Sequence, residues 1–257
     1  MSMKLINGDC LNEMKNIPDK SVNLILCDLP YEVLNKGNKN AQWDKMLPLN
    51  ELWEQYNRII TDNGAILLFA QGMFTCKLMM SNPKNWRYNL IWDKRLAGGF
   101  LNARRMPLRC HEDIVVFYKK LPTYNPQMEE GMPLHSKGTS FKSKEPTNNC
   151  YGSVNITDDL RKGNTQKFPK SILRFDKPHP STLLHPTQKP IELLEYLIKT
   201  YSNEGDVVLD NCMGSGSTGV ACVNTNRNFI GIELNENYFN IAKDRINKIL
   251  NEIKKCL

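Results

Sequence analysis

One segment near the C-terminus limits the possible fold most strongly, because an apolar strand there leads into a glycine-rich turn and then a helix. The strand is Val207-Val208-Leu209-Asp210, the turn runs from Asn211 to Gly216, and the helix begins at Ser217. Glycines let a backbone approach a ligand closely, and the first turn of a helix offers unpaired N–H groups. The segment therefore predicts a ligand-binding turn at the carboxyl end of a strand in an α/β sheet.

The position of this turn in the chain predicts the order of the fold. After Gly219 there is room only for the rest of one helix, a strand at 229–232 and a final helix at 238–253. A glycine turn normally follows a central strand of a doubly wound sheet, so the other strands must come from the N-terminal half. We predict strands at 4–7, 22–27, 65–70, 88–92, 113–118 and 206–209, and helices at 11–16, 48–61, 74–80, 191–201 and 217–224. This alternation predicts an α/β fold with a doubly wound, mostly parallel sheet.

Residues 119–184 interrupt the alternation. Pro, Asn, Ser, Thr, Gly and Lys dominate there, and cations outnumber acids. The cations include Lys137, Lys142, Lys144, Arg161, Lys162, Lys167, Lys170 and Arg174. The stretch predicts either a disordered basic loop or an insertion that contacts nucleic acid. We therefore divide the chain into a first half at 1–118, an irregular basic insertion at 119–184 and a last part at 185–257.

The composition narrows the classes of protein. A net charge of +7 suits a nucleic-acid partner without requiring one. The eight cysteines form no CxxC pair and the four histidines lack metal-ligand spacing, so we predict neither a disulfide framework nor a metal site. The start of the chain has no apolar core of a signal peptide, and no apolar run reaches membrane-spanning length. We expect a cytoplasmic protein with no membrane partner.

The glycine turn also indicates which ligand it binds. The segment from Gly214 to Gly219 formally matches GxGxxG, so a dinucleotide must be considered. However, Asp210 ends the strand, and a carboxylate there would repel a phosphate and attract an ammonium group. The next strand ends at Glu233, whose carboxylate can accept hydrogen bonds from both hydroxyls of a ribose. Asp210, Gly214 and Glu233 together favour S-adenosylmethionine over NAD.

A second turn, Asp28-Leu29-Pro30-Tyr31, directly follows the apolar strand at 22–27. Pro30 holds Leu29 in an extended conformation and stiffens the turn. Ligands bind at the carboxyl ends of the strands in open α/β sheets, so Asp28 and Tyr31 should face the same crevice as the glycine turn. Taken alone, this tetrapeptide would also fit an ordinary turn closed by an aromatic ring.

These segments resemble those of a known family. Asp28 to Tyr31 resembles the Asp-Pro-Pro-Tyr signature of amino methyltransferases, and Asp210 to Gly216 is similar to their Asp-Pro-Phe-x-Gly-Ser-Gly loop. The segment His185-Pro186-Thr187-Gln188-Lys189-Pro190 resembles the part of those enzymes that binds the cofactor carboxylate. The order, catalytic turn first and cofactor turn last, is that of the β-class DNA amino methyltransferases. The resemblance covers most of the chain outside 119–184 and implies a Rossmann-like methyltransferase fold in permuted order.

The resemblance implies a reaction and a catalytic site. The enzyme would transfer a methyl group from S-adenosylmethionine to the N6 amine of adenine in double-stranded DNA, after flipping the base out of the duplex. The Asp28 carboxylate and the Leu29 carbonyl would accept the amine hydrogens, Pro30 would hold the turn, and Tyr31 would stack on the base. Leu29 stands where the family has proline, but it keeps the backbone carbonyl. The family implies neither a metal nor a covalent intermediate.

The resemblance also implies a cofactor site. The methionine end would lie against residues of the glycine turn: Asp210, Asn211, Gly214, Ser215 and Gly216. Thr187 and Lys189 would hold the carboxylate, and Glu233 would hold the ribose. Asp9 and Cys10 would lie near the adenine, although Asp9 equally fits an N-cap of the helix that follows. Asn211 and Cys212 replace the family's Pro-Phe, which leaves the packing against the adenine open.

The implied partner is double-stranded DNA, with 119–184 as the main target-recognition region and with the nucleoid as the location. A homodimer and a cognate restriction endonuclease as a separate chain are both compatible with the resemblance. Two alternatives remain. A cytosine-N4 methyltransferase is disfavoured because such enzymes usually begin the turn with Ser rather than Asp. A catalytically inactive protein that binds cofactor and DNA is disfavoured because Asp28, Pro30 and Tyr31 are all present.

Overall fold

The computed structural model describes residues 1–31, 45–133, 165–178, 181, 184 and 188–256. The chain divides into a main unit, Met1–Asn125 with Ser171–Leu257, and a second unit, Pro126–Lys170. The helices are α1 (Cys10–Met14), α2 (Leu49–Ile59), α3 (Met73–Ser81), α4 (Ile191–Tyr201), α5 (Ser217–Asn224) and α6 (Glu236–Cys256). The strands are β1 (Met3–Asn7), β2 (Val22–Cys27), β3 (Ile60–Ala70), β4 (Trp86–Gly98), β5 (Arg109–Phe117), β6 (Glu129–Glu130), β7 (Gln166–Lys167), β8 (Ile172–Arg174), β9 (Val207–Asp210) and β10 (Asn228–Glu233).

The main unit is built on an eight-stranded sheet in the order β1-β10-β9-β2-β3-β5-β4-β8. Its neighbouring strands are parallel except where β5 pairs antiparallel with β3 and β4. The chain moves from β2 outward to β3 in one direction and from β9 outward to β10 in the other, so the winding reverses between β2 and β9. Ligands of such sheets bind outside the carboxyl ends of the strands at this reversal. The predicted doubly wound, mostly parallel sheet is confirmed.

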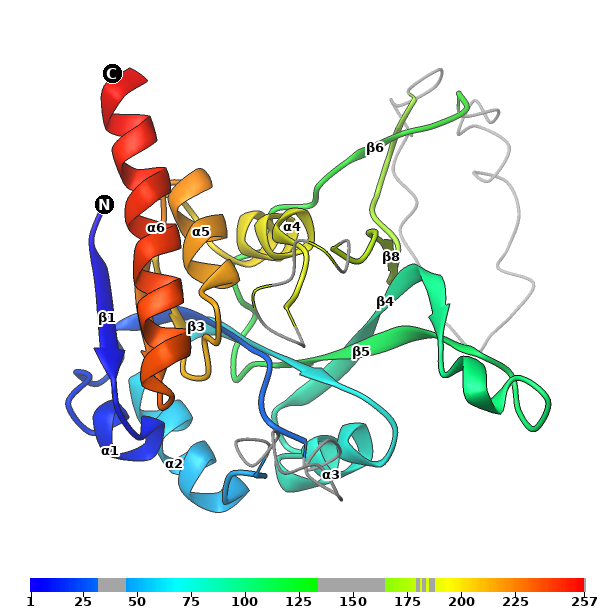
Figure 1. Cartoon of the computed structure of the whole chain (residues 1–257), viewed down its shortest axis with the longest axis horizontal. Coiled ribbons are helices and arrows are strands. Elements are labelled where there is room, and N and C mark those ends of the chain that lie inside the picture. The colour runs from blue at the N-terminus through cyan, green and yellow to red at the C-terminus, as the bar shows by residue number, and fades with distance from the viewer. Residues whose placement is uncertain (32–44, 134–164, 179–180, 182–183, 185–187, 257) are drawn as a thin grey trace, which may run out of the picture. The chain divides into compact units, whose positions relative to one another are not determined.

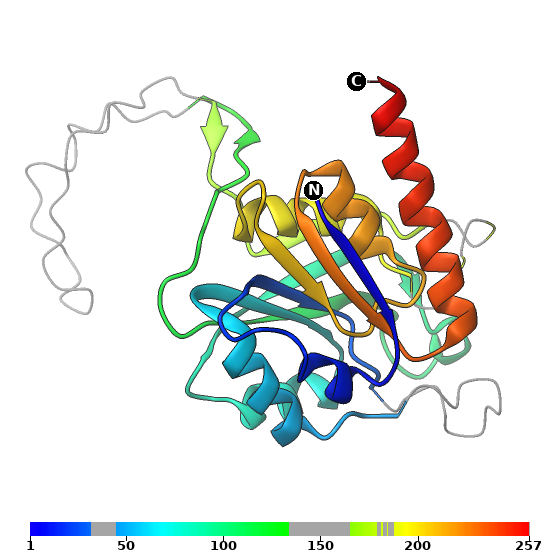
Figure 2. The same ribbon diagram turned by 90° about the vertical axis from the view of Figure 1, so that its left-hand side faces the viewer.

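Helices cover both faces of this sheet, as Figures 1 and 2 show. Successive residues of a strand point to opposite faces, so β2 contributes to two cores. Leu24 and Leu26 pack on the side of α4, α5 and α6, whereas Ile25 and Cys27 pack on the side of α1, α2 and α3. All four side chains are buried. A strand buried on both faces explains why β2 is a continuous apolar run in the sequence.

The junction of α2 and β3 differs from the prediction. We expected the helix to continue to residue 61 and the strand to begin at residue 65, but α2 ends at Ile59 and β3 begins at Ile60. Ile60 is buried and pairs with Val22, and the next paired residues are Leu24 and Ala65. The residues between them leave the ladder as a bulge, in which Asp62 and Asn63 are exposed. Asn63-Gly64 therefore interrupts a strand rather than separating a helix from a strand, because Ile60 packs in the core and pairs with Val22.

The predicted insertion at 119–184 also differs, because part of it belongs to the main sheet. Ile172–Arg174 forms β8 and pairs with β4, and the Leu173 side chain is buried in the core under α4. A strand of three residues is too short to produce a recognisable alternation, which is why the sequence did not predict it. In the second unit, β6 and β7 pair antiparallel, with Glu129 opposite Lys167. Lys137, Lys142, Lys144, Arg161 and Lys162 lie outside the described residues.

The longest helix, α6, packs against the core through one apolar stripe. Ala242 and Ile246 are completely buried, and Phe239 and Ile249 pack beside them. The rest of its surface is rich in Asn, Lys and Glu, as expected for a helix that covers one side of a sheet. Among the described residues, no helix is both long enough and apolar enough to cross a membrane.

Candidate functional site

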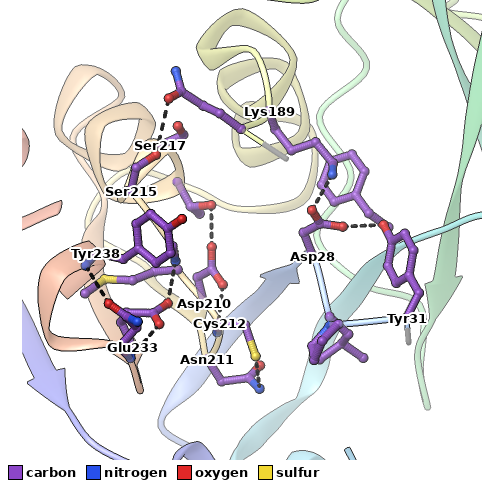
Figure 3. Close-up of a pocket in the computed structure, with 18 of the residues that line it drawn as sticks. Asp28, Tyr31, Lys189, Asp210, Asn211, Cys212, Ser215, Ser217, Glu233 and Tyr238 are labelled. Atoms are coloured by element: carbon purple, nitrogen blue, oxygen red, sulfur yellow. Dashed lines mark hydrogen bonds and ion pairs between the residues drawn. The ribbon is translucent and has the colours of Figure 1, made fainter. Parts of the chain in front are cut away.

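A cavity of about 1040 Å³ lies where β2, β9 and β10 end, and Figure 3 shows the side chains around it. The turn after each strand contributes to its wall. The predicted site residues that line it are Asp9, Cys10, Asp28, Leu29, Pro30, Tyr31, Lys189, Asp210, Asn211, Gly214, Ser215 and Glu233. Gly216 does not line it, and Thr187 lies outside the described residues. The structure thus brings two turns that are distant in sequence into one cavity.

Asp210 is fixed by the helix that follows the glycine turn. The Thr218 hydroxyl donates a hydrogen bond to Asp210 Oδ2 at 2.6 Å, and the backbone N–H of Cys212 donates to Oδ1 at 3.1 Å. The side chain is almost completely buried, and this burial raises the pKa of Asp210 to about 6. The carboxylate is therefore held in one orientation and is poorly hydrated, so an incoming cation would interact with it strongly.

Gly216 supports the turn from behind. Its φ of 76° lies in the left-handed region, which favours glycine. A Cβ atom at this position would lie 2.8 Å from the Cβ of Ala242 on α6. Close packing of α6 against the turn explains this glycine without a direct contact to a ligand.

Two further carboxylates lie on this side of the cavity. Glu233 Oε2 accepts a hydrogen bond from the N–H of Gly214, and Oε1 accepts one from the N–H of Asn235, both at 2.8 Å. Burial raises the pKa of Glu233, and backbone hydrogen bonds oppose this shift. Asp9 lines the cavity and also caps α1, because its Oδ1 accepts the N–H of Asn12 at 3.0 Å. The N-cap predicted for Asp9 is confirmed.

The Asp28 turn has a different environment. The Tyr31 hydroxyl donates a hydrogen bond to Asp28 Oδ1, and the Lys189 ammonium donates one to Oδ2. Lys189 Nζ also lies 3.5 Å from Glu112 Oε2, and Lys94 forms an ion pair with Oε1 of the same carboxylate. The four charged groups form an alternating row, Asp28–Lys189–Glu112–Lys94. The family resemblance assigns Lys189 to the cofactor carboxylate, whereas in this structure Lys189 forms an ion pair with Asp28.

Charge and burial compete within this row. Burial raises the pKa of Asp28 and exceeds the lowering effect of the Lys189 charge. Burial also acts to raise the pKa of Glu112, but the charges of Lys189 and Lys94 outweigh it, so this pKa is lowered. For Lys189, burial acts to lower the pKa, and the Asp28 and Glu112 charges reverse the shift. Lys189 is therefore a stable cation that favours the ionised form of Asp28.

The segment before α4 connects the two turns. Gln188 accepts a hydrogen bond at 3.3 Å from the hydroxyl of Ser215, which belongs to the glycine turn. The next residue, Lys189, pairs with Asp28 on the other turn. Two adjacent residues thus contact the two halves of the cavity, which the sequence could not show.

Other residues of the site were also missed from the sequence. The Tyr31 ring stacks on Phe74 of α3, with ring centroids 4.9 Å apart and an angle of 27° between the planes. The Tyr56 hydroxyl of α2 donates a hydrogen bond to Asn211 Oδ1 at 2.5 Å. Phe74 and Tyr56 belong to apolar helix faces, where an aromatic residue usually indicates only a core position.

The Tyr56 contact explains one departure from the family motif. Asn211 is buried where the family has proline, and the Tyr56 hydroxyl satisfies its carbonyl oxygen. Its amide nitrogen lies 3.6 Å from the Cys212 sulfur, and the Cys212 thiol interacts with those of Cys10 and Cys27. The polar substitution is therefore accompanied by polar neighbours on α1, α2 and β2.

The cavity has two chemically different sides. Asp9, Asp210 and Glu233 make the glycine-turn side acidic, which suits a ligand that carries an ammonium group and hydroxyls rather than phosphates. The other side has a carboxylate, a backbone turn and an aromatic ring at Asp28, Pro30 and Tyr31, which suits a flat, hydrogen-bonding ring. The arrangement suits two ligands placed next to each other, as a group transfer requires.

Comparison with known proteins shows which family the chain resembles. The sequence profile of a family described as DNA methylase, N6_N4_Mtase, matches residues 22–244. The Type II methyltransferase M.HpaI of Haemophilus parainfluenzae is 28% identical over 263 residues, which cover 98% of this chain and 76% of that protein. The DNA adenine methyltransferase YhdJ of Escherichia coli (strain K12) is 29% identical over 258 residues, which cover 94% of this chain and 82% of that protein.

A solved structure supports the fold. The M1.HpyAVI–SAM complex superposes with a TM-score of 0.64 at 24% sequence identity, covering 95% of this chain and 99% of that chain. At this level of identity the similarity concerns the arrangement of the sheet and helices. It agrees with the methyltransferase-type α/β fold that the motif order implied.

Proposed function

Because the chain belongs to the N6_N4_Mtase family of DNA methylases, we propose that it transfers a methyl group from S-adenosylmethionine to the N6 amine of adenine at a specific site in double-stranded DNA. The observation that carries this proposal is the single cavity in which the Asp28 turn and the glycine turn meet. Membership of the family covers methylation of DNA. The choice of adenine rests on Asp28 as the first residue of its turn and on the adenine-specific relative.

The residues of the acidic side fit S-adenosylmethionine. This cofactor supplies a methyl group already activated on a sulfonium. Asp210, fixed by Thr218, would hold its ammonium group, and Glu233 would accept the ribose hydroxyls. Asp9 and Cys10 would lie along the adenine. The sequence motif assigns the cofactor carboxylate to Thr187, which lies outside the described residues.

The Asp28 turn would activate the target amine. An aromatic amine is a weak nucleophile because its lone pair is delocalised into the ring. Acceptance of its two hydrogens by the Asp28 carboxylate and the Leu29 carbonyl would increase electron density on the nitrogen, an electrostatic effect that is strong in a buried site. Tyr31, backed by Phe74, would stack on the base.

Lys189 would have two successive roles in this scheme. Its ammonium pairs with Asp28 Oδ2, an oxygen that the target amine would need. Entry of the base would therefore displace Lys189 from Asp28, and Lys189 would turn toward the cofactor carboxylate that the sequence motif assigns to it. Until then its charge would favour the ionised form of Asp28.

Chemistry on a base inside a duplex requires that the base be extruded, so the DNA must be held while it opens. We propose that the basic stretch at 119–184, apart from β8, forms the main target-recognition region, with cations on phosphates and polar side chains on base edges. DNA binding would place the protein in the cytoplasm at the nucleoid. A homodimer remains a prediction that analytical ultracentrifugation can test. A cognate restriction endonuclease remains a prediction that a search of the neighbouring genes can test.

Expression in a host that lacks DNA methylation, followed by sequencing of modified bases, tests the proposal. We expect N6-methyladenine at one recurring short sequence, and none when Asp28→Ala is expressed at the same level. N4-methylcytosine in its place would support the cytosine-specific alternative. Unmodified DNA from cells with abundant folded protein would indicate the inactive cofactor- and DNA-binding alternative.

A further inference from the structure

The end of the β4–β5 hairpin, residues 95–109, consists of the last residues of β4, the connecting turn and the first residue of β5, and it is called the hairpin tip below. Several of its apolar side chains are unusually exposed. Phe100 is 80% exposed, Leu101 97% and Met106 57%. Figure 1 shows the β4–β5 hairpin extending outward from the sheet of the main unit, with this turn at its far end. Large apolar side chains gathered at the end of a projecting hairpin indicate a surface that a partner covers.

The charge of the hairpin tip indicates the kind of partner. The segment contains Arg95, Arg104, Arg105 and Arg109 and no acidic residue. Arg95 lies 3.7 Å from the exposed Asp176 carboxylate. Among the described residues, no carboxylate lies within ion-pair distance of the other three arginines. The tip therefore combines apolar side chains with unneutralised cations, which suits a polyanion.

The start of the hairpin tip also reaches the cavity. Leu96 and Ala97 line the cavity of the Asp28 turn. Leu96 and Lys177 are shared with a second hollow of about 340 Å³, whose wall includes Arg109. A partner bound at the tip would therefore lie next to the place where the target base enters.

We propose that the hairpin tip inserts Phe100 and Leu101 into the base stack of duplex DNA beside the target base, while Arg104 and Arg105 contact flanking phosphates. The inference rests on the proposed function. Apolar side chains that wedge between base steps unstack them, and backbone contacts stabilise the opened duplex. The tip would fill or hold open the space left by the extruded base, a role separate from sequence recognition by 119–184.

A second copy of the chain is a less suitable occupant. An isologous contact through the tip would place the four arginines of one copy near the same four of the other, with no acid from either tip to neutralise them. DNA supplies the opposite charge along its whole length. The charge pattern thus favours a duplex over self-association.

The test compares Phe100→Ala/Leu101→Ala with wild type on two short duplexes that carry the mapped site. In one the target base is paired, and in the other it lies opposite an abasic site and is already unpaired. We expect kcat/KM on the paired duplex to fall about tenfold or more, since the variant lacks the side chains that unstack the step beside the target base. On the abasic duplex the variant should be close to wild type. Met80→Ala, which alters a similarly exposed apolar side chain on α3, should match wild type on both.

A second variant tests the phosphate contacts. Other results would show whether the wedge, the choice of DNA as the partner or the proposed function is wrong. Arg104→Gln/Arg105→Gln should make the salt dependence of DNA binding shallower by about one to two phosphate contacts. Undiminished activity of the apolar variant on the paired duplex would overturn the wedge, as would an equal loss on both duplexes. A lower molar mass of the variant in light scattering would show that a second copy covers the tip. Wild-type protein that methylates neither duplex would refute the proposed function itself.

Discussion

Protonation of Asp210 should weaken cofactor binding as the pH falls from 7 to 5. Burial raises the pKa of this carboxyl from its ordinary value of 3.8 to about 6, and only the ionised form attracts an ammonium group. About nine-tenths of the protein would carry the ionised form at pH 7 and about one-tenth at pH 5. Affinity is therefore lost on the acid side of about pH 6, where the free protein must release a proton before it can bind.

The expected size of the effect follows from these fractions. S-adenosylhomocysteine keeps its ammonium group over this range. Its Kd should rise about tenfold from pH 7 to pH 5, which corresponds to a loss of about 1.4 kcal/mol of binding free energy. Isothermal titration calorimetry at a series of pH values measures this directly. A Kd that does not change between pH 7 and pH 5 would refute the assignment of Asp210 to the ammonium group.

Asp210→Asn provides the matched control, because an amide can still bond to Thr218 and to the N–H of Cys212. We expect it to bind S-adenosylhomocysteine more weakly at pH 7 by about 1.5–3 kcal/mol and to lose this pH dependence. If the variant kept the same dependence, Glu233 or another group would be responsible. Ionisation of Asp210 opposes folding increasingly between pH 3.8 and about 6, so the variant should be more stable at pH 7, by up to about 3 kcal/mol.

Three further changes test other parts of the site. Tyr31→Ala should remove a stacking surface worth about 1–3 kcal/mol, so a fluorescent base analogue at the target position should brighten much less on binding; undiminished brightening would show that the ring does not hold the base. Lys189→Met should raise the pKa of Asp28 and move the acid limb of the pH–rate profile to higher pH, and an unmoved limb would contradict the ion pair. Gly216→Ala should lower the free energy of unfolding by about 1–3 kcal/mol in urea denaturation, because its Cβ would lie 2.8 Å from that of Ala242, and an unchanged midpoint would show that α6 can move away.

Much of the fold is predictable because its central strands are buried on both faces. Local apolar patterns predict these elements, and the folded protein forms them at those positions: the continuous apolar strands β2 and β9 and the amphipathic helices α4 and α6. The start of β3 at Ile60 is not predictable in this way, because the pairing with Val22 decides it rather than any local pattern. The same holds for β8, which exists only because β4 offers an edge for three residues.

The site residues likewise include some that local sequence patterns predict and others that only tertiary packing places. The Asp28 turn and the glycine turn could be placed together because the carboxyl ends of parallel strands meet at one edge of a sheet. Glu112 was missed because it comes from β5, the antiparallel strand, where it stands among other polar residues that give no sign of which one faces the cavity. The pairing of Lys189 with Asp28 joins residues 161 positions apart and depends on the packing of α4.

The claim that the two turns form one active site is tested most directly by methyl transfer from labelled S-adenosylmethionine to site-bearing duplex DNA, with wild type and Asp28→Ala compared at saturating cofactor. The account predicts a rate lower by roughly two to three orders of magnitude in the variant, since one preorganised acceptor is lost. S-adenosylhomocysteine should bind both proteins with similar affinity, because Asp210 and Glu233 are untouched. Near-normal turnover by Asp28→Ala would contradict the account and place the chemistry elsewhere.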